Sequence, residues 1–242
     1  MVNYAALAII AVLSVAVGFA SFDYFTTHTQ YRTIEEQVYG KVAVQLAAVD
    51  EEDNGLMLPM TVEVKPGSGK VLINIDNPSF ILDTQESMRV AVREAAKISR
   101  ADQSSIDVLF SINGGQAQIV GGPSAGAAMA VAASAAMMNK RLREGVVVSG
   151  TIEEGGDIGP VGGLLPKAKA AKSVGTTLFI VPRGQAYQNE PVETCTSEVR
   201  PDFRSRYCTV TYKTTSLADV AGIEVKEAST LADALQLAIQ EE

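Results

Sequence analysis

The stretch GPSAGAAMAVAASAAMMNK, residues 122–140, is the most informative part of this 242-residue sequence. A glycine-rich loop precedes it, and Pro123 suits the first position of a helix. Alanine then predominates, which favours a helix as far as about Lys140. We therefore expect Ser124 to lie at a helix N-terminus, beside free backbone N–H groups and the positive end of the helix dipole.

Further strands and helices are predicted on both sides of this helix. We expect strands at residues 41–49, 57–64, 70–75, 106–112, 145–152 and 177–181, and helices at 83–99, 166–174 and 231–240. Polar turns separate the first three strands, which predicts an antiparallel meander. The helix that begins at Asp83 is expected to cover the sheet with Met88, Val92, Ala95 and Ala96. Because strands and helices alternate irregularly, the predicted fold class is α+β.

The first 22 residues contain no charged side chain. Roughly 20 apolar residues in a helix cross the hydrocarbon core of a bilayer, so we interpret residues 1–22 as a single-pass transmembrane anchor. A cleaved signal peptide is the alternative, because Gly18-Phe19-Ala20 resembles a cleavage site. Residues 23–37 are expected to be a linker, and residues 38–242 the folded domain.

The charge balance and the single histidine exclude several classes of function. The chain has 28 acidic and 20 basic residues, and a net charge of −8 argues against nucleic-acid partners. The histidine, His28, lies in the predicted linker, so the folded domain contains neither a histidine base nor a histidine metal ligand. The turn at residues 66–70 lacks the first glycine and the hydroxyl of a phosphate-binding loop. We therefore predict no metal and no cofactor.

Both cysteines, Cys195 and Cys208, lie in a polar segment at residues 184–212. A disulfide between them would contribute about 3 kcal/mol by closing a loop, and would indicate an extracytoplasmic domain. Two unpaired thiols in a reducing compartment are the alternative interpretation.

The sequence GPSAG fits the G-x-S-x-G pattern of serine hydrolases, but no histidine follows Ser124. A lysine can replace histidine as the base when burial lowers its pKa. Lys167 is the best candidate, because it lies among apolar residues in the first turn of its predicted helix. Lys169 and Lys172 are expected to face solvent. The alternative is that a glycine loop merely packs a helix that carries surface lysines.

Three segments in order, GPSAG (122–126), SG (149–150) and GPVGGLLPK (159–167), resemble the proteolytic domain of Lon proteases, the S16 serine peptidases. The similarity extends to GKV (40–42), PGSGK (66–70), QES (85–87) and LADAL (231–235), and so covers about residues 38–242. The resemblance implies a ribosomal protein S5 domain 2-like fold. It also implies that Ser124 is the nucleophile, supported by Gly122, Pro123 and Ala125, and that Lys167 is the general base. Ser149 stands where the family commonly has a threonine that hydrogen-bonds the lysine.

The chain departs from this family at Gly121, where an aspartate is common, and at Thr151, where a glutamate is common. Residues 184–212 look like an insertion that forms a lid or an assembly contact. Typical Lon enzymes also carry an AAA+ ATPase ring, in whose place this chain has the apolar N-terminal segment.

The resemblance thus implies a membrane-anchored, ATP-independent serine endopeptidase that cleaves unfolded or flexible polypeptides. We expect it to form a homo-oligomer, with or without a separate partner that delivers substrates, and to hold its catalytic domain outside the cytoplasm. One alternative is a catalytically silent Lon-like scaffold that binds peptides at the membrane. Another is a small-molecule kinase, because glycine- and serine-rich loops that open a helix also bind phosphates.

Overall fold

The computed structural model describes residues 39–74, 79–80, 82–112, 119–120, 122–200 and 202–240. The expected anchor at 1–22, the linker at 23–37 and Gly121 lie outside these residues, and their interpretation stays a prediction. Within the described residues, none of the helices has both the length and the apolar character needed to cross a bilayer.

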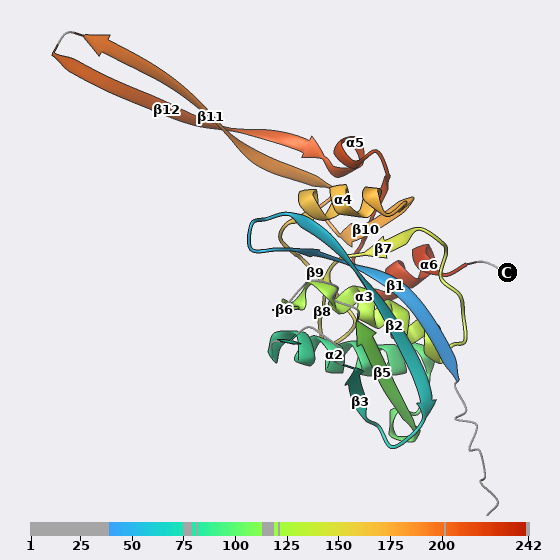
Figure 1. Cartoon of the computed structure of the whole chain (residues 1–242). Coiled ribbons are helices and arrows are strands. Elements are labelled where there is room, and N and C mark those ends of the chain that lie inside the picture. The colour runs from blue at the N-terminus through green and yellow to red at the C-terminus, as the bar shows by residue number, and fades with distance from the viewer. Residues whose placement is uncertain are drawn as a thin grey trace, which may run out of the picture. The chain divides into compact units, whose positions relative to one another are not determined.

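A seven-stranded mixed sheet forms the centre of the domain, in the order β13-β10-β7-β1-β2-β5-β3 (Figure 1). Its strands are β1 (Gly40–Val49), β2 (Gly55–Pro66), β3 (Val71–Asn74), β5 (Ile106–Ile112), β7 (Val146–Val148), β10 (Leu178–Pro182) and β13 (Glu224–Ala228). β1 runs antiparallel to β2 and parallel to β7. Two short pairs accompany this sheet, β4 (Ser79–Phe80) with β6 (Ile119–Val120), and β8 (Thr151–Ile152) with β9 (Ile158–Gly159).

The predicted antiparallel meander is wrong at its third strand. β3 does not pair with β2, but lies parallel to β5 at the edge of the sheet. The turn before β3 explains this, because the Asp107 carboxylate at the start of β5 accepts hydrogen bonds from the N–H groups of Ser68 and Lys70, both 2.8 Å long. This long-range contact carries the chain across β5 to its outer edge.

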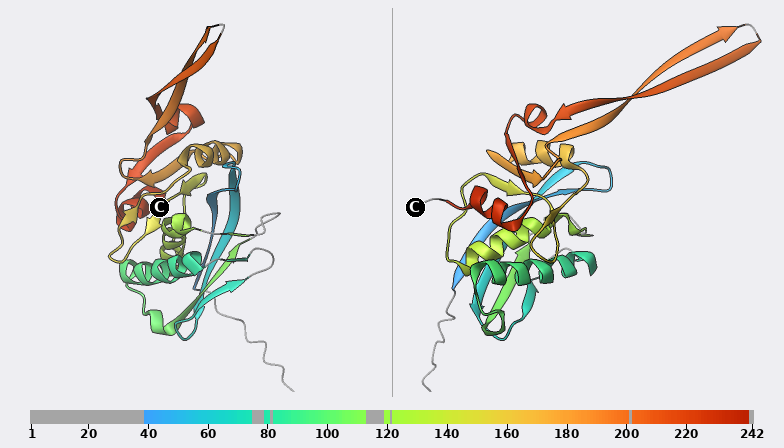
Figure 2. Two further views of the ribbon diagram at one scale, coloured as in Figure 1. Left: turned by 90° about the vertical axis from the view of Figure 1, so that its left-hand side faces the viewer. Right: turned by 180° about the vertical axis from the view of Figure 1, so that it is seen from behind.

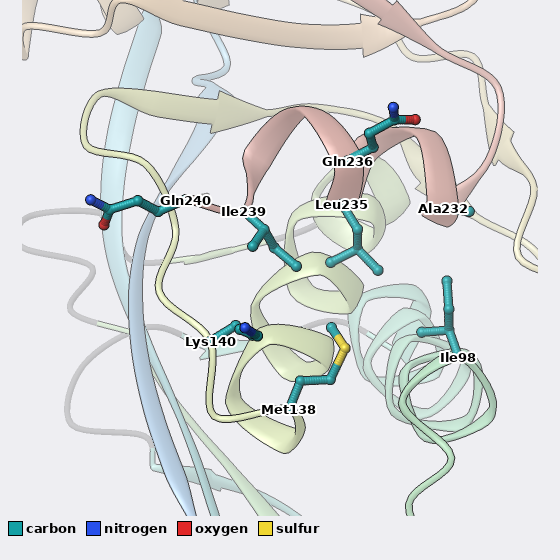
Figure 3. Close-up of a pocket in the computed structure, with 8 residues that line it drawn as sticks. All are labelled: Ile98, Met138, Lys140, Ala232, Leu235, Gln236, Ile239 and Gln240. Atoms are coloured by element: carbon teal, nitrogen blue, oxygen red, sulfur yellow. The ribbon is translucent and has the colours of Figure 1, made fainter. Parts of the chain in front are cut away.

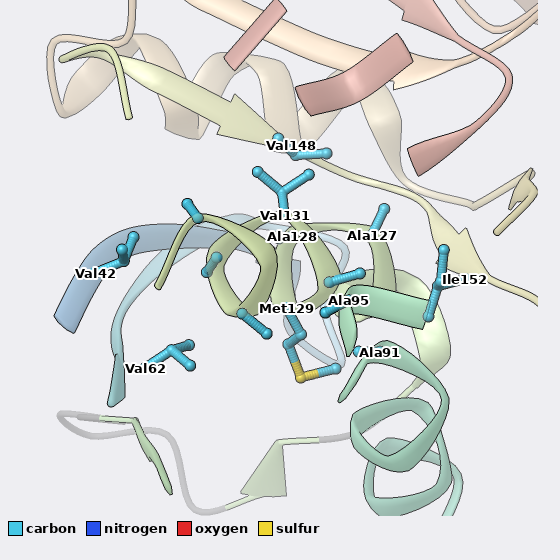
Figure 4. Close-up of a cluster of buried hydrophobic side chains, with 14 of the residues drawn as sticks. Val42, Val62, Ala91, Ala95, Ala127, Ala128, Met129, Val131, Val148 and Ile152 are labelled. Carbon is cyan, nitrogen blue, oxygen red and sulfur yellow. The ribbon is translucent and has the colours of Figure 1, made fainter. Parts of the chain in front are cut away.

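Helix α3 (Gly126–Met137) is buried on every side, as expected for a helix that is apolar all round. Figure 4 shows it between the sheet residues Val42 and Val62 and the α2 residues Ala91 and Ala95. Small alanine side chains let α3 lie this close to both neighbours. The buried face predicted for α2 (Leu82–Ser99) is confirmed, although α2 covers the sheet mainly through α3.

Helices α4 (Leu164–Ser173) and α5 (Leu217–Ala221) lie on the opposite face of the sheet. Val148 and Ile180 belong to the core around α3, whereas their strand neighbours Val147 and Phe179 belong to the smaller core around α4 and α5. Successive residues of a strand point to opposite faces, which places the two helix layers on the two sides of the sheet. Helix α6 (Leu231–Ala238) completes the core around α3.

Residues 187–216 form a long two-stranded arm that projects from the body (Figures 1 and 2). It consists of β11 (Tyr187–Arg200) and β12 (Phe203–Ser216), paired antiparallel along their whole length. Cys195 and Cys208 stand directly opposite each other and form a disulfide, with their Cα atoms 4.0 Å apart. A polar insertion was expected at residues 184–212, but its strands were not predicted.

Candidate active site

Ser124 lies in a short 3₁₀ turn, η2 (Pro123–Ala125), which leads directly into α3. Gly122 precedes this turn with φ +90°, a conformation that favours glycine. Ser124 is only partly buried, in contrast to the fully buried helix that follows it. The structure therefore places the serine at an accessible helix N-terminus, as the sequence predicted.

The segment Ser149–Gly150 lies against the first turn of α3. The Gly150 N–H donates to the Ser124 carbonyl, and the Ala127 N–H donates to the Gly150 carbonyl, each over 3.0 Å. A side chain at Gly150 would meet Ile158 Cγ2 of β9 at 2.6 Å and Ala127 Cβ of α3 at 3.2 Å, so glycine lets the segment pack tightly between them. These contacts fix Ser149 beside Ser124 in the structure.

The Ser149 side chain is buried, and its Oγ has no hydrogen-bond partner in the described part of the chain. The predicted hydrogen bond from this hydroxyl to Lys167 is thus not formed here. A buried hydroxyl that lacks a partner costs about 1–3 kcal/mol and calls for an explanation. Thr151, the second departure from the family pattern, is partly buried and begins β8.

Lys167 occupies the first turn of α4, and only 2% of its surface is exposed. Burial lowers the pKa of its ammonium group from 10.5 to about 8, and no described carboxylate offsets this effect. Lys169 and Lys172 on the same helix are exposed, as predicted. Among these three lysines, Lys167 is the buried one.

The first turns of α3 and α4 meet the sheet at the same end. Ser124 is bonded to Gly150, two residues beyond the end of β7. The loop before α4 lies against the last residue of β1, because a side chain at Gly163 would meet Val49 Cγ1 at 2.8 Å. β1 and β7 pair at Leu46 and Val148, so the ends of these strands are neighbours. Both helix starts therefore lie at the same end of the central strands β1 and β7, while Cys195 and Cys208 lie in the projecting arm.

Two residues near this site were missed by the sequence analysis. Thr84 in the first turn of α2 is buried, and its Oγ1 lies 3.5 Å from the Gly122 carbonyl. The Gln185 side chain forms two 2.9 Å hydrogen bonds to the backbone of Val161, in the loop that leads to α4. Neither contact leaves a signal in the sequence, because each joins segments more than 20 positions apart.

A separate cavity of about 520 Å³ lies between the end of α2, the end of α3 and α6. Figure 3 shows Leu235 and Ile239 of the C-terminal segment facing Met138 and Ile98 across it. Its lining is mainly apolar and includes none of the predicted site residues. This cavity therefore does not contribute to the candidate site.

Residues 25–212 match the Lon protease (S16) C-terminal proteolytic domain. The chain is similar to Archaeal Lon protease of Thermococcus kodakarensis, with 25% identity over 66% of this chain and 25% of the relative. It is also similar to Archaeal Lon protease of Thermoplasma volcanium, with 31% identity over 54% of this chain and 20% of the relative. Lon protease 2 of Bacillus subtilis is 29% identical over 67% of this chain and 30% of the relative.

The chain spans between one fifth and one third of the length of these curated relatives. The family match itself covers well over half of the chain, and includes the helix start at Ser124 and the buried Lys167. The chain therefore belongs to the Lon (S16) proteolytic-domain family.

Proposed function

We propose that this protein is a serine endopeptidase in which Ser124 is the nucleophile and Lys167 the general base. The observation that carries the proposal is the burial of Lys167, whose pKa falls to about 8 with no described carboxylate to hold the proton. A lysine of this kind is neutral often enough near pH 7 to accept a proton from a serine. For a lysine with only a structural role, burial of the ammonium group would bring a cost and no benefit.

In the proposed reaction, Lys167 Nζ takes the proton of Ser124 Oγ while that oxygen attacks the carbonyl carbon of a peptide bond. The C–N bond then breaks, and the Lys167 ammonium gives its proton to the departing amine. The acyl group stays on Ser124 as an ester. Water attacks this ester with Lys167 again as the base, and the free serine and the new carboxyl group result.

The first turn of α3 offers donors for the oxyanion of the tetrahedral intermediate. The first N–H bonded within η2 is that of Gly126, which donates to the Pro123 carbonyl. The N–H groups of Ser124 and Ala125 precede it and lie at the positive end of the helix dipole. We assign the oxyanion to this part of the chain.

Ser149 is proposed to hold Lys167 in place during the reaction. Its buried hydroxyl has no partner among the described residues, and it would gain one by accepting a hydrogen bond from the lysine ammonium. That contact would form when Lys167 carries the transferred proton.

We further propose that residues 1–22 anchor the enzyme in a membrane, and that it cleaves unfolded or flexible polypeptides without hydrolysing ATP. The Cys195–Cys208 disulfide supports a catalytic domain outside the cytoplasm, because disulfides persist in oxidising compartments. A separate partner that delivers substrates is compatible with this arrangement.

Covalent labelling of the full-length chain with a fluorophosphonate probe in detergent tests the chemistry. The wild type should be labelled, Ser124→Ala should not, and Lys167→Met should be labelled far more slowly. Ser173→Ala and Lys169→Met are matched controls, since both residues lie on α4 away from the predicted dyad. Equal labelling of wild type and Ser124→Ala would refute the proposal.

The alternative, a silent Lon-like scaffold, gives a different result in the same experiment. Such a protein would bind unfolded polypeptide, but would neither react with the probe nor cleave its ligand. The departures from the family pattern at Gly121 and Thr151 are the observations that favour this alternative.

A further inference from the structure

The β11–β12 arm presents a large surface that nothing in the described chain covers. Tyr212 is 72% exposed, Val199 65% and Val210 53%, all far above the usual exposure of such side chains. A two-stranded ribbon is at best marginally stable by itself in water. Its apolar side chains and its length therefore indicate that the arm packs against another surface in the working protein.

The register of the ribbon divides the arm into two different faces. Directly paired residues share a face, and successive residues alternate between faces. One face carries the disulfide, and we call it the disulfide face. It includes Val199 paired with Arg204, Arg206 paired with Ser197, and Tyr212. The opposite face carries Arg200, Phe203, Tyr207 and Lys213.

The cations on the two faces differ in their partners. Arg200 forms an ion pair with Glu198, and by sequence the opposite face carries equal numbers of acidic and basic residues. Arg204 and Arg206 have no ion-pair partner within the described residues, although Arg206 Nη2 lies 3.2 Å from Cys195 Sγ. The disulfide face also carries one carboxylate, Glu193, close to the disulfide. It thus combines exposed apolar groups with two arginines and one glutamate, a net charge of +1.

The charge distribution of the chain indicates what this face binds. The arm has as many acidic as basic residues, so its net charge is zero and the rest of the chain carries the whole −8. Two acidic bodies repel each other, whereas the cationic face of an arm attracts the body of another copy. The disulfide face draws seven residues from each 14-residue strand, so it offers a long, narrow contact surface rather than a broad one.

We propose that the disulfide face of the arm docks onto the acidic body of a second copy of this chain. The arm of one copy thereby joins it to the next, and repetition of this contact builds the oligomer. The inference does not rest on the proposed peptidase activity, because assembly can be measured on the Ser124→Ala chain.

The test is the mass of the full-length Ser124→Ala chain in detergent, measured by light scattering over a range of concentrations. The parent chain should self-associate, and addition of Arg204→Glu with Arg206→Glu should weaken the association at least about tenfold. The matched control is Arg200→Glu with Lys213→Glu, which reverses two cations on the opposite face and should change it less than about twofold. Raising the salt from about 0.1 M to about 1 M should mimic the first double variant.

Circular dichroism and absence of free thiols will establish that each variant keeps its folded, disulfide-linked arm. A parent chain that stays monomeric overturns the proposal, as does equal weakening by both double variants. A third result would also overturn it: a monomeric chain in which the Arg204 and Arg206 changes weaken binding of unfolded polypeptide. That outcome would assign the face to substrate instead.

Discussion

The surroundings of Lys167 and the β11–β12 arm are held in place by opposite means. Lys167 lies in the body, almost wholly buried, on a helix whose residues Leu164 and Ala168 belong to the smaller core on one face of the seven-stranded sheet. The arm buries little, and depends on its own ladder of strand pairs and one disulfide. The body can thus impose an unfavourable environment on a cation, whereas the arm can present groups to a partner without disturbing the site.

The strongest test of this contrast is Lys167→Met. We expect cleavage of a short peptide to fall about 10³-fold, because the general base is lost. The same change should raise the free energy of unfolding at pH 7 by roughly 3 kcal/mol, since one pKa unit corresponds to about 1.4 kcal/mol. Activity assays and urea unfolding followed by circular dichroism measure the two effects. Lys169→Met, on the exposed side of α4, should change neither.

The sign of this stability effect follows from the pKa of Lys167. Its folded-state pKa, about 8, lies below the 10.5 of an ordinary lysine. Below pH 8 both states bind the proton, and the folded state carries the cost of a buried charge. This cost should fade as the pH rises from 8 towards 10.5, so the stability difference between Lys167→Met and the wild type should shrink over that range. A difference that does not depend on pH would contradict the assignment.

The pH dependence of catalysis should report the same group. If neutral Lys167 is the base, kcat/KM for a short peptide rises about tenfold per pH unit below pH 8 and levels off above it. Between pH 6 and the plateau this amounts to about 100-fold. A profile that is flat between pH 6 and pH 9 would assign the proton transfer to another group.

Substitution of Ser149 should also reduce catalysis, but by less than substitution of Lys167. We expect Ser149→Ala to reduce kcat about tenfold, the value of one hydrogen bond to Lys167, without loss of stability, because the hydroxyl has no partner in the structure. Ser149→Thr keeps the hydroxyl and should retain activity. Ser134→Ala is the control, because this buried serine of α3 bonds the Ala130 carbonyl instead. A large loss of stability in Ser149→Ala would indicate a structural role.

A substitution at Gln185, two residues before the arm begins, tests whether this part of the chain supports the site. Gln185→Met removes both hydrogen bonds to Val161 and should reduce kcat about three- to tenfold, because the loop before α4 is then less well fixed. KM for a short peptide should not change. Gln236→Met, an exposed change on α6, serves as the control. An unaltered kcat would show that the hydrogen bonds of Gln185 to Val161 do not contribute to catalysis.

The disulfide should affect the arm alone. Cys195→Ser with Cys208→Ser removes about 3 kcal/mol of constraint, which predicts roughly 100-fold faster amide exchange in β11 and β12. Cleavage of a short peptide should stay within about twofold of the wild type, since distant sites act independently. Loss of peptide cleavage would show that the two regions are coupled.

The same contrast explains what the sequence could predict. The bounds of the strand at residues 106–112 were predicted correctly. In the structure every second residue, beginning with the apolar Ile106, is buried, and the residues between are half-buried. The burial of Lys167 followed from its apolar neighbours in a first helical turn. Strand β3 was misplaced because its position depends on Asp107, far along the chain. The arm escaped prediction because neither face is buried, so no alternation marks its strands.

Helix α3 also links Ser124 to a distant point of the molecule. At its other end, a side chain at Gly40 would overlap the carbonyl of Ala136. Because α3 is enclosed on all sides, added bulk at Gly40 would be relieved most readily by sliding the helix along its axis. Ser124 would move with it by a fraction of an ångström. Substitution of Gly40, a helix length away from Ser124, should therefore destabilise the protein, and in the folded fraction the nucleophile should be out of alignment with its base.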